Sequence, residues 1–112
     1  MNTFNEYQMA VTETAVYPGP GTLNGLAYVT LGLAGEAGEL ANKVKKAYRD
    51  DGEELTPLRK AELKKELGDV LWYASQMATE LGILLADVAA DNLDRLQSRK
   101  QRGTLHGSGD NR

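Results

Sequence analysis

The sequence contains no cysteine, only one histidine, and one residue each of tryptophan and phenylalanine among its 112 residues. The absence of cysteine excludes disulfide bonds and thiolate chemistry. No apolar run approaches the roughly 20 residues that a membrane span requires. The first ten residues, MNTFNEYQMA, have neither a basic region nor an apolar core, so we expect no signal peptide. These absences predict a cytoplasmic protein that has no membrane partner.

An excess of basic residues is also missing, because 13 Lys and Arg stand against 16 Asp and Glu, for a formal net charge of −3. This balance argues against a protein that binds nucleic acid. The charge is unevenly distributed, since residues 95–112 contain one acid, Asp110, and five bases: Arg95, Arg99, Lys100, Arg102 and Arg112. A carboxylate-rich centre and a basic end suit a metal together with a phosphorylated ligand.

The length predicts a single domain with a modest core, which leaves apolar surface for a partner subunit. Apolar residues recur with a helical period in four segments, at about 3–14, 24–49, 57–81 and 84–100. Thr3, Asn24 and Thr56 are the predicted N-caps, and Pro57 follows at the first helical position. The pattern predicts an all-α bundle of about four helices. Because two helices have wide apolar faces, we expect dimerisation to complete the core.

Three segments interrupt or follow these helices. Residues 17–21, YPGPG, break any helix and predict a short exposed loop. The acidic residues at 50–54 predict a solvated turn. Residues 102–112 contain three glycines and no periodicity, which is typical of a flexible tail. We therefore divide the chain into a helical domain, 1–101, and a Gly-rich tail, 102–112.

Two pairs of carboxylates are the main candidates for chemistry. Glu36 and Glu39 lie three residues apart on the second predicted helix, and Glu66 and Asp69 lie three apart on the third. On a helix each pair shares one face. The first member of each pair lies about 60° from the centre of the apolar face, and the second about 120° on the same side. If the two helices pack core to core, four carboxylates could converge on one edge of the seam.

Clustered carboxylates repel one another, so such a site requires a cation. Oxygen ligands without cysteine favour Mg²⁺ first and Mn²⁺ second. His106, the sole histidine, lies in the tail, which excludes a ferritin-like di-iron site. The alternative is that the glutamates are ordinary surface charges, with Glu39 and Lys43 forming a common i,i+4 pair.

Glycines and an asparagine near these helices each have two interpretations. Gly32, Gly35 and Gly38 lie within a turn of the two glutamates, and they favour either close helix packing or room for a ligand. Asn92 lies in the apolar stripe of the last predicted helix. Such an amide is usually a hydrogen-bonded core residue, and a ligand role is the less common alternative.

The segments LGLAGEAGELANKVKK, KKELGDVLWY and NLDRLQSR resemble the MazG-like, all-α nucleoside triphosphate pyrophosphohydrolases. The shared pattern is ExxE, a spacer of 26 residues here, and then ExxD, and the resemblance extends over roughly residues 4–112. It implies a dimer or a dimer of dimers that hydrolyses a nucleoside triphosphate to the monophosphate and pyrophosphate with Mg²⁺. It also implies that the metal ligands are Glu36, Glu39, Glu66 and Asp69, one glutamate also orienting or deprotonating the attacking water.

The resemblance implies substrate contacts as well. Asn92 and Arg95 match positions that contact the sugar and phosphates, although many members have lysine where this chain has Arg95, and Arg99 is a further candidate. Tyr73 resembles a position near the sugar or base. The tail resembles that of compact members, and we expect it either to fold over the nucleotide, with Arg112 near the phosphates, or to be mobile.

Two alternatives remain open from the sequence. A related phosphoribosyl-ATP pyrophosphohydrolase would share the helices and the acidic chemistry, and a substrate panel would separate it. A non-catalytic helical interaction module would show neither a Mg²⁺-dependent thermal shift nor pyrophosphate release.

Overall fold

The computed structural model describes residues 1, 3–52 and 54–109, and this part of the chain forms helices without strands. The helices are α1 (Phe4–Thr12), α2 (Leu23–Asp50), α3 (Pro57–Glu80) and α4 (Leu85–Gln101). The all-α class with about four helices is therefore confirmed. None of the helices in these residues combines the length and the apolar character needed to cross a bilayer.

The N-caps agree with the sequence prediction at two helices and differ at one. Thr3 caps α1, and Thr56 caps α3 with proline in the first turn. The predicted cap at Asn24 is wrong, because the N-cap of α2 is Thr22, two residues earlier. The hydroxyl of Thr22, whose backbone is extended, accepts a hydrogen bond from the Gly25 N–H at 3.4 Å. Asn24 thus lies inside the first helical turn.

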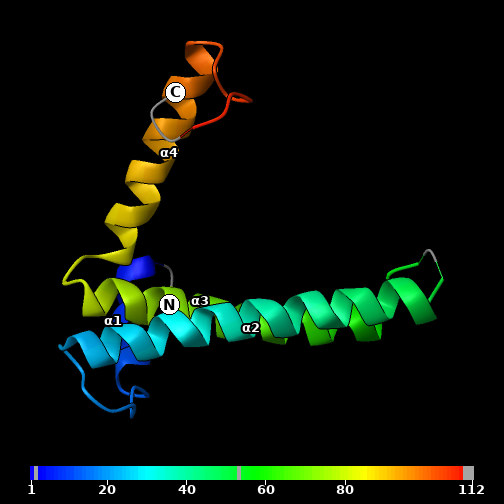
Figure 1. Cartoon of the computed structure of the whole chain (residues 1–112), viewed down its shortest axis with the longest axis horizontal. Coiled ribbons are helices and arrows are strands. Elements are labelled where there is room, and N and C mark those ends of the chain that lie inside the picture. The colour runs from blue at the N-terminus through cyan, green and yellow to red at the C-terminus, as the bar shows by residue number, and fades with distance from the viewer. Residues whose placement is uncertain (2, 53, 110–112) are drawn as a thin grey trace.

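Helices α2 and α3 form a long antiparallel pair that dominates the packing (Figure 1). Their contacts run in opposite directions along the chain, since Gly32 packs on Tyr73 while Lys43 pairs with Glu66. Helix α2 ends at Asp50 and α3 begins at Pro57, so only a short turn separates the two helices in sequence. In this antiparallel arrangement, a residue of α2 lies beside the residue of α3 that is about equally far along the chain from the turn.

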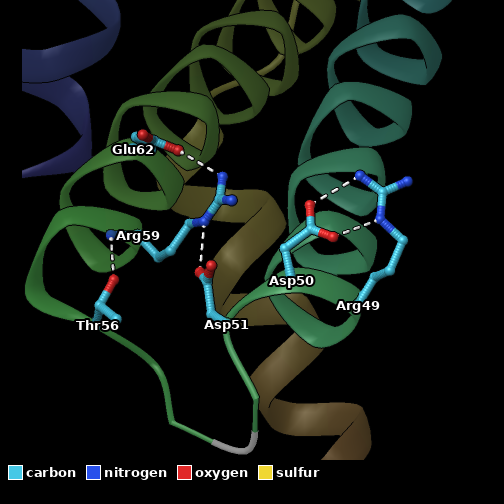
Figure 2. Close-up of polar contacts among 6 residues, drawn as sticks. All are labelled: Arg49, Asp50, Asp51, Thr56, Arg59 and Glu62. Carbon is cyan, nitrogen blue, oxygen red and sulfur yellow. Dashed lines mark hydrogen bonds and ion pairs between the residues drawn. The ribbon is translucent and has the colours of Figure 1, made fainter.

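The acidic turn between α2 and α3 is solvated only in part: Asp50 and Glu54 are exposed as predicted, Asp51 is half-buried, and Glu53 lies outside the described residues. Figure 2 shows the Arg59 guanidinium between two acids: its Nε lies 2.6 Å from Asp51 and its Nη1 lies 3.3 Å from Glu62. Asp50 pairs with Arg49 at 2.7 Å. Arg59 lies in the first turn of α3, and its side chain points back toward the C-terminal end of α2. The turn is thus tied to α3 by charge.

A buried glutamine joins α1 to the far end of α3. The Gln8 Nε2 donates to the Thr79 hydroxyl at 3.1 Å and to the Ile83 carbonyl at 3.0 Å. The Gln8 Oε1 accepts from the Leu85 N–H at 2.9 Å. Gln8 therefore pairs with two backbone groups at the α3–α4 connection, the Ile83 carbonyl and the Leu85 N–H. The second of these lies at the start of α4, where the N-cap residue makes no side-chain hydrogen bond.

The loop at 17–21 is exposed at Pro18, Pro20 and Gly21, as predicted, but it is anchored through Tyr17, which the sequence did not indicate. The Tyr17 side chain is buried, and its hydroxyl donates to Glu80 and accepts from the Gln76 Nε2 at 3.2 Å. The other carboxylate oxygen of Glu80 accepts from the Gly21 N–H at 2.8 Å. Glu80 thus holds both ends of the loop against α3.

Helix α4 projects away from the α2/α3 pair (Figure 1), and in the described residues it contacts only α1 and α3. Leu85 is its only buried residue, while Val88, Leu93 and Leu96 are 42%, 54% and 39% exposed. The radius of gyration is 16.9 Å, against about 13 Å for a compact domain of this length. The accessible surface is 8147 Å², against about 6,100 Å² for a compact monomer of this mass. A single chain thus leaves a large apolar surface uncovered.

We predict that Gly32→Ala lowers the free energy of unfolding by about 1–3 kcal/mol, because a Cβ at this position would overlap the Tyr73 ring and displace it. Gly35→Ala, on the same helix, is the matched control. A Cβ there meets open space, so helix propensity should raise stability by up to about 1 kcal/mol. Urea denaturation measures both changes, and equal effects of the two substitutions would contradict the close-packing interpretation of Gly32.

Candidate active site

The antiparallel pairing places three of the four predicted carboxylates together. Glu36 comes from α2, while Glu66 and Asp69 come from adjacent turns of α3. One oxygen of each carboxylate lies within 4.8 Å of the others. We call these three side chains the carboxylate cluster. It lies on one edge of the helix pair, as the helical offsets predict.

The offsets also predict which carboxylates border the core. Glu36 and Glu66 are half-buried, whereas Glu39 and Asp69 are exposed. Glu39 is not part of the cluster, so the structure does not bring all four predicted ligands together. Its charge still acts on Glu36, which indicates that it lies close by. A change in its exposed side chain could bring it nearer.

The surroundings shift the pKa values of two cluster carboxylates in opposite directions. Burial, and then the charges of Asp69 and Glu66, raise the pKa of Glu36 above its usual value. The pKa of Glu66 is lowered, first by its hydrogen bond with Lys43. A hydrogen bond also joins Glu36 to Glu66. The opposite shifts mean that Glu36 takes up a proton more readily than Glu66 does.

Lys43 supplies a positive charge at the cluster. Its Nζ lies 2.7 Å from the Glu66 Oε1. Lys43 therefore pairs with Glu66 and not with Glu39, the i,i+4 partner that the spacing suggested. Lys43 instead reaches across to α3, which brings its ammonium to a carboxylate that is more buried than Glu39.

A cavity of about 340 Å³ opens beside the cluster. It is lined by Thr14, Glu36, Asp69, Trp72 and Tyr73. The Trp72 indole N–H donates to the Thr14 hydroxyl at 2.8 Å, so the segment after α1 forms one wall. The predicted substrate residue Tyr73 thus lies in the same cavity as two cluster carboxylates.

Two cavity residues, Thr14 and Trp72, were missed by sequence reasoning. Trp72 lies three residues after Asp69, and that spacing on a helix could have indicated it. Its ring meets Tyr73 edge to face, with centroids 4.9 Å apart, and meets Tyr17 in the same way at 6.4 Å. Thr14 could not have been found, because nothing in the sequence relates it to a residue 58 positions later.

Tyr7 is another residue near the cluster that the sequence did not single out. Burial raises the pKa of its phenol, and the charge of Asp69 raises it further. Tyr7 belongs to α1, so this helix approaches the cluster as well as the far end of α3.

The predicted substrate residues on α4 are not brought to the cluster within one chain. Asn92 and Arg95 are exposed, and Arg99 is half-buried. The common interpretation of Asn92 as a buried core amide is therefore wrong for the single chain. Arg112 lies outside the described residues. The tail leaves α4 at Gly103, whose positive φ of 72° suits a glycine after a helix end.

The cluster fits a hard divalent cation. Its donors are all carboxylate oxygens, which Mg²⁺ and Mn²⁺ prefer. Burial, and then the charges of Asp69 and Glu66, disfavour the ionised form of Glu36. A cation bound to Glu36, Glu66 and Asp69 would relieve the repulsion among the three carboxylates.

Comparisons with known proteins identify a family for most of the chain. The sequence pattern of the MazG nucleotide pyrophosphohydrolase domain matches residues 25–104, which include α3, α4 and nearly all of α2 but not α1. The Gene 37 protein of Mycobacterium phage L5 is 53% identical over 109 residues, which are 95% of this chain and 96% of that protein. Its name states no activity. No solved structure matches the chain.

Replacing Glu36 should make the metal-free protein more stable at neutral pH. We expect Glu36→Gln to melt at a higher temperature than the wild type at pH 7, because a neutral amide costs less to bury than a carboxylate and does not repel Asp69 and Glu66. The difference should disappear below pH 4.5, the ordinary pKa of the group. A folded-state pKa above the unfolded value makes this contribution fully present at low pH and lost as pH rises through the folded value. Thermal melts across this pH range measure the effect.

The same variant tests the metal site. Added Mg²⁺ or Mn²⁺ should raise the melting temperature of the wild type, because a ligand that binds only the folded state stabilises it. It should leave Glu36→Gln unchanged. Glu54→Gln, an exposed substitution in the α2–α3 turn, is the control and should respond as the wild type does. A full metal response in Glu36→Gln would show that Glu36 is not a ligand.

Proposed function

Because the chain belongs to the MazG nucleotide pyrophosphohydrolase family, we propose that it hydrolyses a nucleoside triphosphate to the monophosphate and pyrophosphate with Mg²⁺. The observation that carries this proposal is the carboxylate cluster of Glu36, Glu66 and Asp69, two of which, Glu36 and Asp69, line a cavity. Mn²⁺ could replace Mg²⁺, since it accepts the same oxygen ligands.

The chain's residues divide into metal-binding and substrate-binding groups. Glu36, Glu66 and Asp69 would hold the metal, and Glu39 would join them through a change of its exposed side chain. When bound, Mg²⁺ would neutralise triphosphate charge and make a nearby water more acidic. One of the glutamates then orients that water or accepts its proton.

The reaction itself is a displacement at the α-phosphorus. Water attacks this atom, the bond to the bridging oxygen breaks, and pyrophosphate leaves. Trp72 and Tyr73 border the same cavity as Glu36 and Asp69, so their rings are placed to contact the sugar or base. Their edge-to-face contact holds the two rings in a defined orientation.

Pyrophosphate release from a panel of NTPs and dNTPs, with oxidised and methylated forms and phosphoribosyl-ATP included, tests the activity. We expect Mg²⁺-dependent release with a monophosphate product. Asp69→Asn and Glu39→Gln should each lower turnover by more than about 100-fold with helicity unchanged, because each removes a charge from the site. Glu54→Gln should keep full activity. Wild-type turnover in either site variant would refute its role, and silence across the panel would refute the proposed reaction.

We further propose that the active form is a dimer or a dimer of dimers. The surface of a single chain exceeds that of a compact monomer by about 2,000 Å². A standard interface buries about 800 Å² per partner, and obligate homodimers bury more. A second copy packed on the apolar side of α4 would cover this excess. It would also give Asn92 and Arg95 the buried surroundings that a sugar or phosphate contact requires.

Leu93→Asp should convert the assembly to monomers, because it places a charge in the apolar stripe of α4. Sedimentation or light scattering at micromolar concentration measures the change. Gln97→Asp, on the same helix and already polar and exposed, should leave the assembly intact. A wild-type protein that is monomeric at these concentrations would contradict the proposal.

A further inference from the structure

We propose that Lys43 is a positioning residue of the carboxylate cluster, whose ammonium fixes the Glu66 carboxylate so that the oxygen it leaves open can bind the metal. This inference rests on the proposed function, since it requires that the cluster bind a divalent cation. It concerns a residue that neither the ExxE nor the ExxD motif contains.

The order of contacts along the helix pair places Lys43 on one side of the cluster. Starting from the cavity, Gly32 packs on Tyr73, then Glu36 meets Asp69 and Glu66, and then Lys43 meets Glu66. Lys43 follows Glu36 by seven residues, two helical turns, so both project from the same face of α2. The ammonium therefore approaches Glu66 from the turn side, and the cavity side of the cluster stays open.

The contact engages one oxygen of Glu66. The Lys43 Nζ lies 2.7 Å from Oε1, within the range of a charge-assisted hydrogen bond. A carboxylate has two oxygens and about four acceptor positions, so Oε2 remains able to bind a cation. Ligating carboxylates are commonly held by such outer hydrogen bonds, and losing them typically weakens metal affinity 10- to 100-fold.

The position of the pair favours this role over a purely structural one. Among the ion pairs of the described residues, the Lys43–Glu66 pair is the one that includes a cluster carboxylate. The Glu66 side chain is only 15% exposed, whereas Lys43 is 31% exposed. Because both side chains keep contact with solvent, the pair adds at most about 1 kcal/mol to stability. Its main consequence is the orientation of a half-buried carboxylate that would otherwise choose among several rotamers.

The test is a Mn²⁺ titration of the nucleotide-free protein, followed by calorimetry or by the loss of the free-ion EPR signal. Lys43→Met should raise the Mn²⁺ dissociation constant about 10- to 100-fold while the melting temperature of the metal-free protein stays near that of the wild type. Lys43→Arg keeps the charge and should recover part of the affinity. Lys45→Met removes an exposed charge two residues away and is the matched control, with no change expected.

The sign of the change separates the two explanations. If Lys43 merely repelled the incoming cation, Lys43→Met would bind Mn²⁺ more tightly, and that result, or unchanged affinity, would overturn the inference. Should Lys43→Met not fold, Lys43→Gln is measured in the same way with the same two outcomes. A wild-type protein without Mn²⁺ affinity would overturn both this inference and the proposed metal dependence. Tight wild-type binding with an unaffected Lys43→Met overturns this inference alone.

Discussion

The packing of α2 against α3 brings like charges together, and the rest of the site depends on how their repulsion is balanced. Glu36, Glu66 and Asp69 would separate if the helices were free, because their oxygens lie within 4.8 Å of one another, well inside the roughly 8 Å over which physiological salt screens charges. Apolar contact along the helix pair holds them in place. The ammonium of Lys43 compensates part of the charge. A divalent cation would compensate more of it.

Polar contacts at the far end of the helix pair serve the same site indirectly. Gln8 fixes α1 on α3, and Glu80 fixes the loop that follows α1. Together they determine the path of the chain between these two anchors. That path brings Thr14 to Trp72 and closes one wall of the cavity. The segment that contains Thr14, which lies outside the matched family region, thus contributes to the site by forming part of the cavity wall.

Helix α4 is packed against the rest of the chain less extensively than the other three helices. It is anchored at Leu85 and otherwise exposes an apolar stripe that a chain of this size would normally bury. A helix of 17 residues is near the lower limit of stability in water without tertiary contacts. Its stripe and its polar residues, Asn92 and Arg95, are therefore best understood as parts of an assembly.

The sequence by itself determined the four helices, the caps at Thr3 and Thr56, and which carboxylate of each pair borders the core. These features depend on the helical period and on hydrogen bonds between neighbours, both of which can be read locally. The tertiary structure alone decided that Lys43 pairs with Glu66 rather than Glu39, that Tyr17 is buried, and that Asn92 is exposed. Each of these outcomes depends on which surfaces meet across tens of residues, and local periodicity contains no information on that.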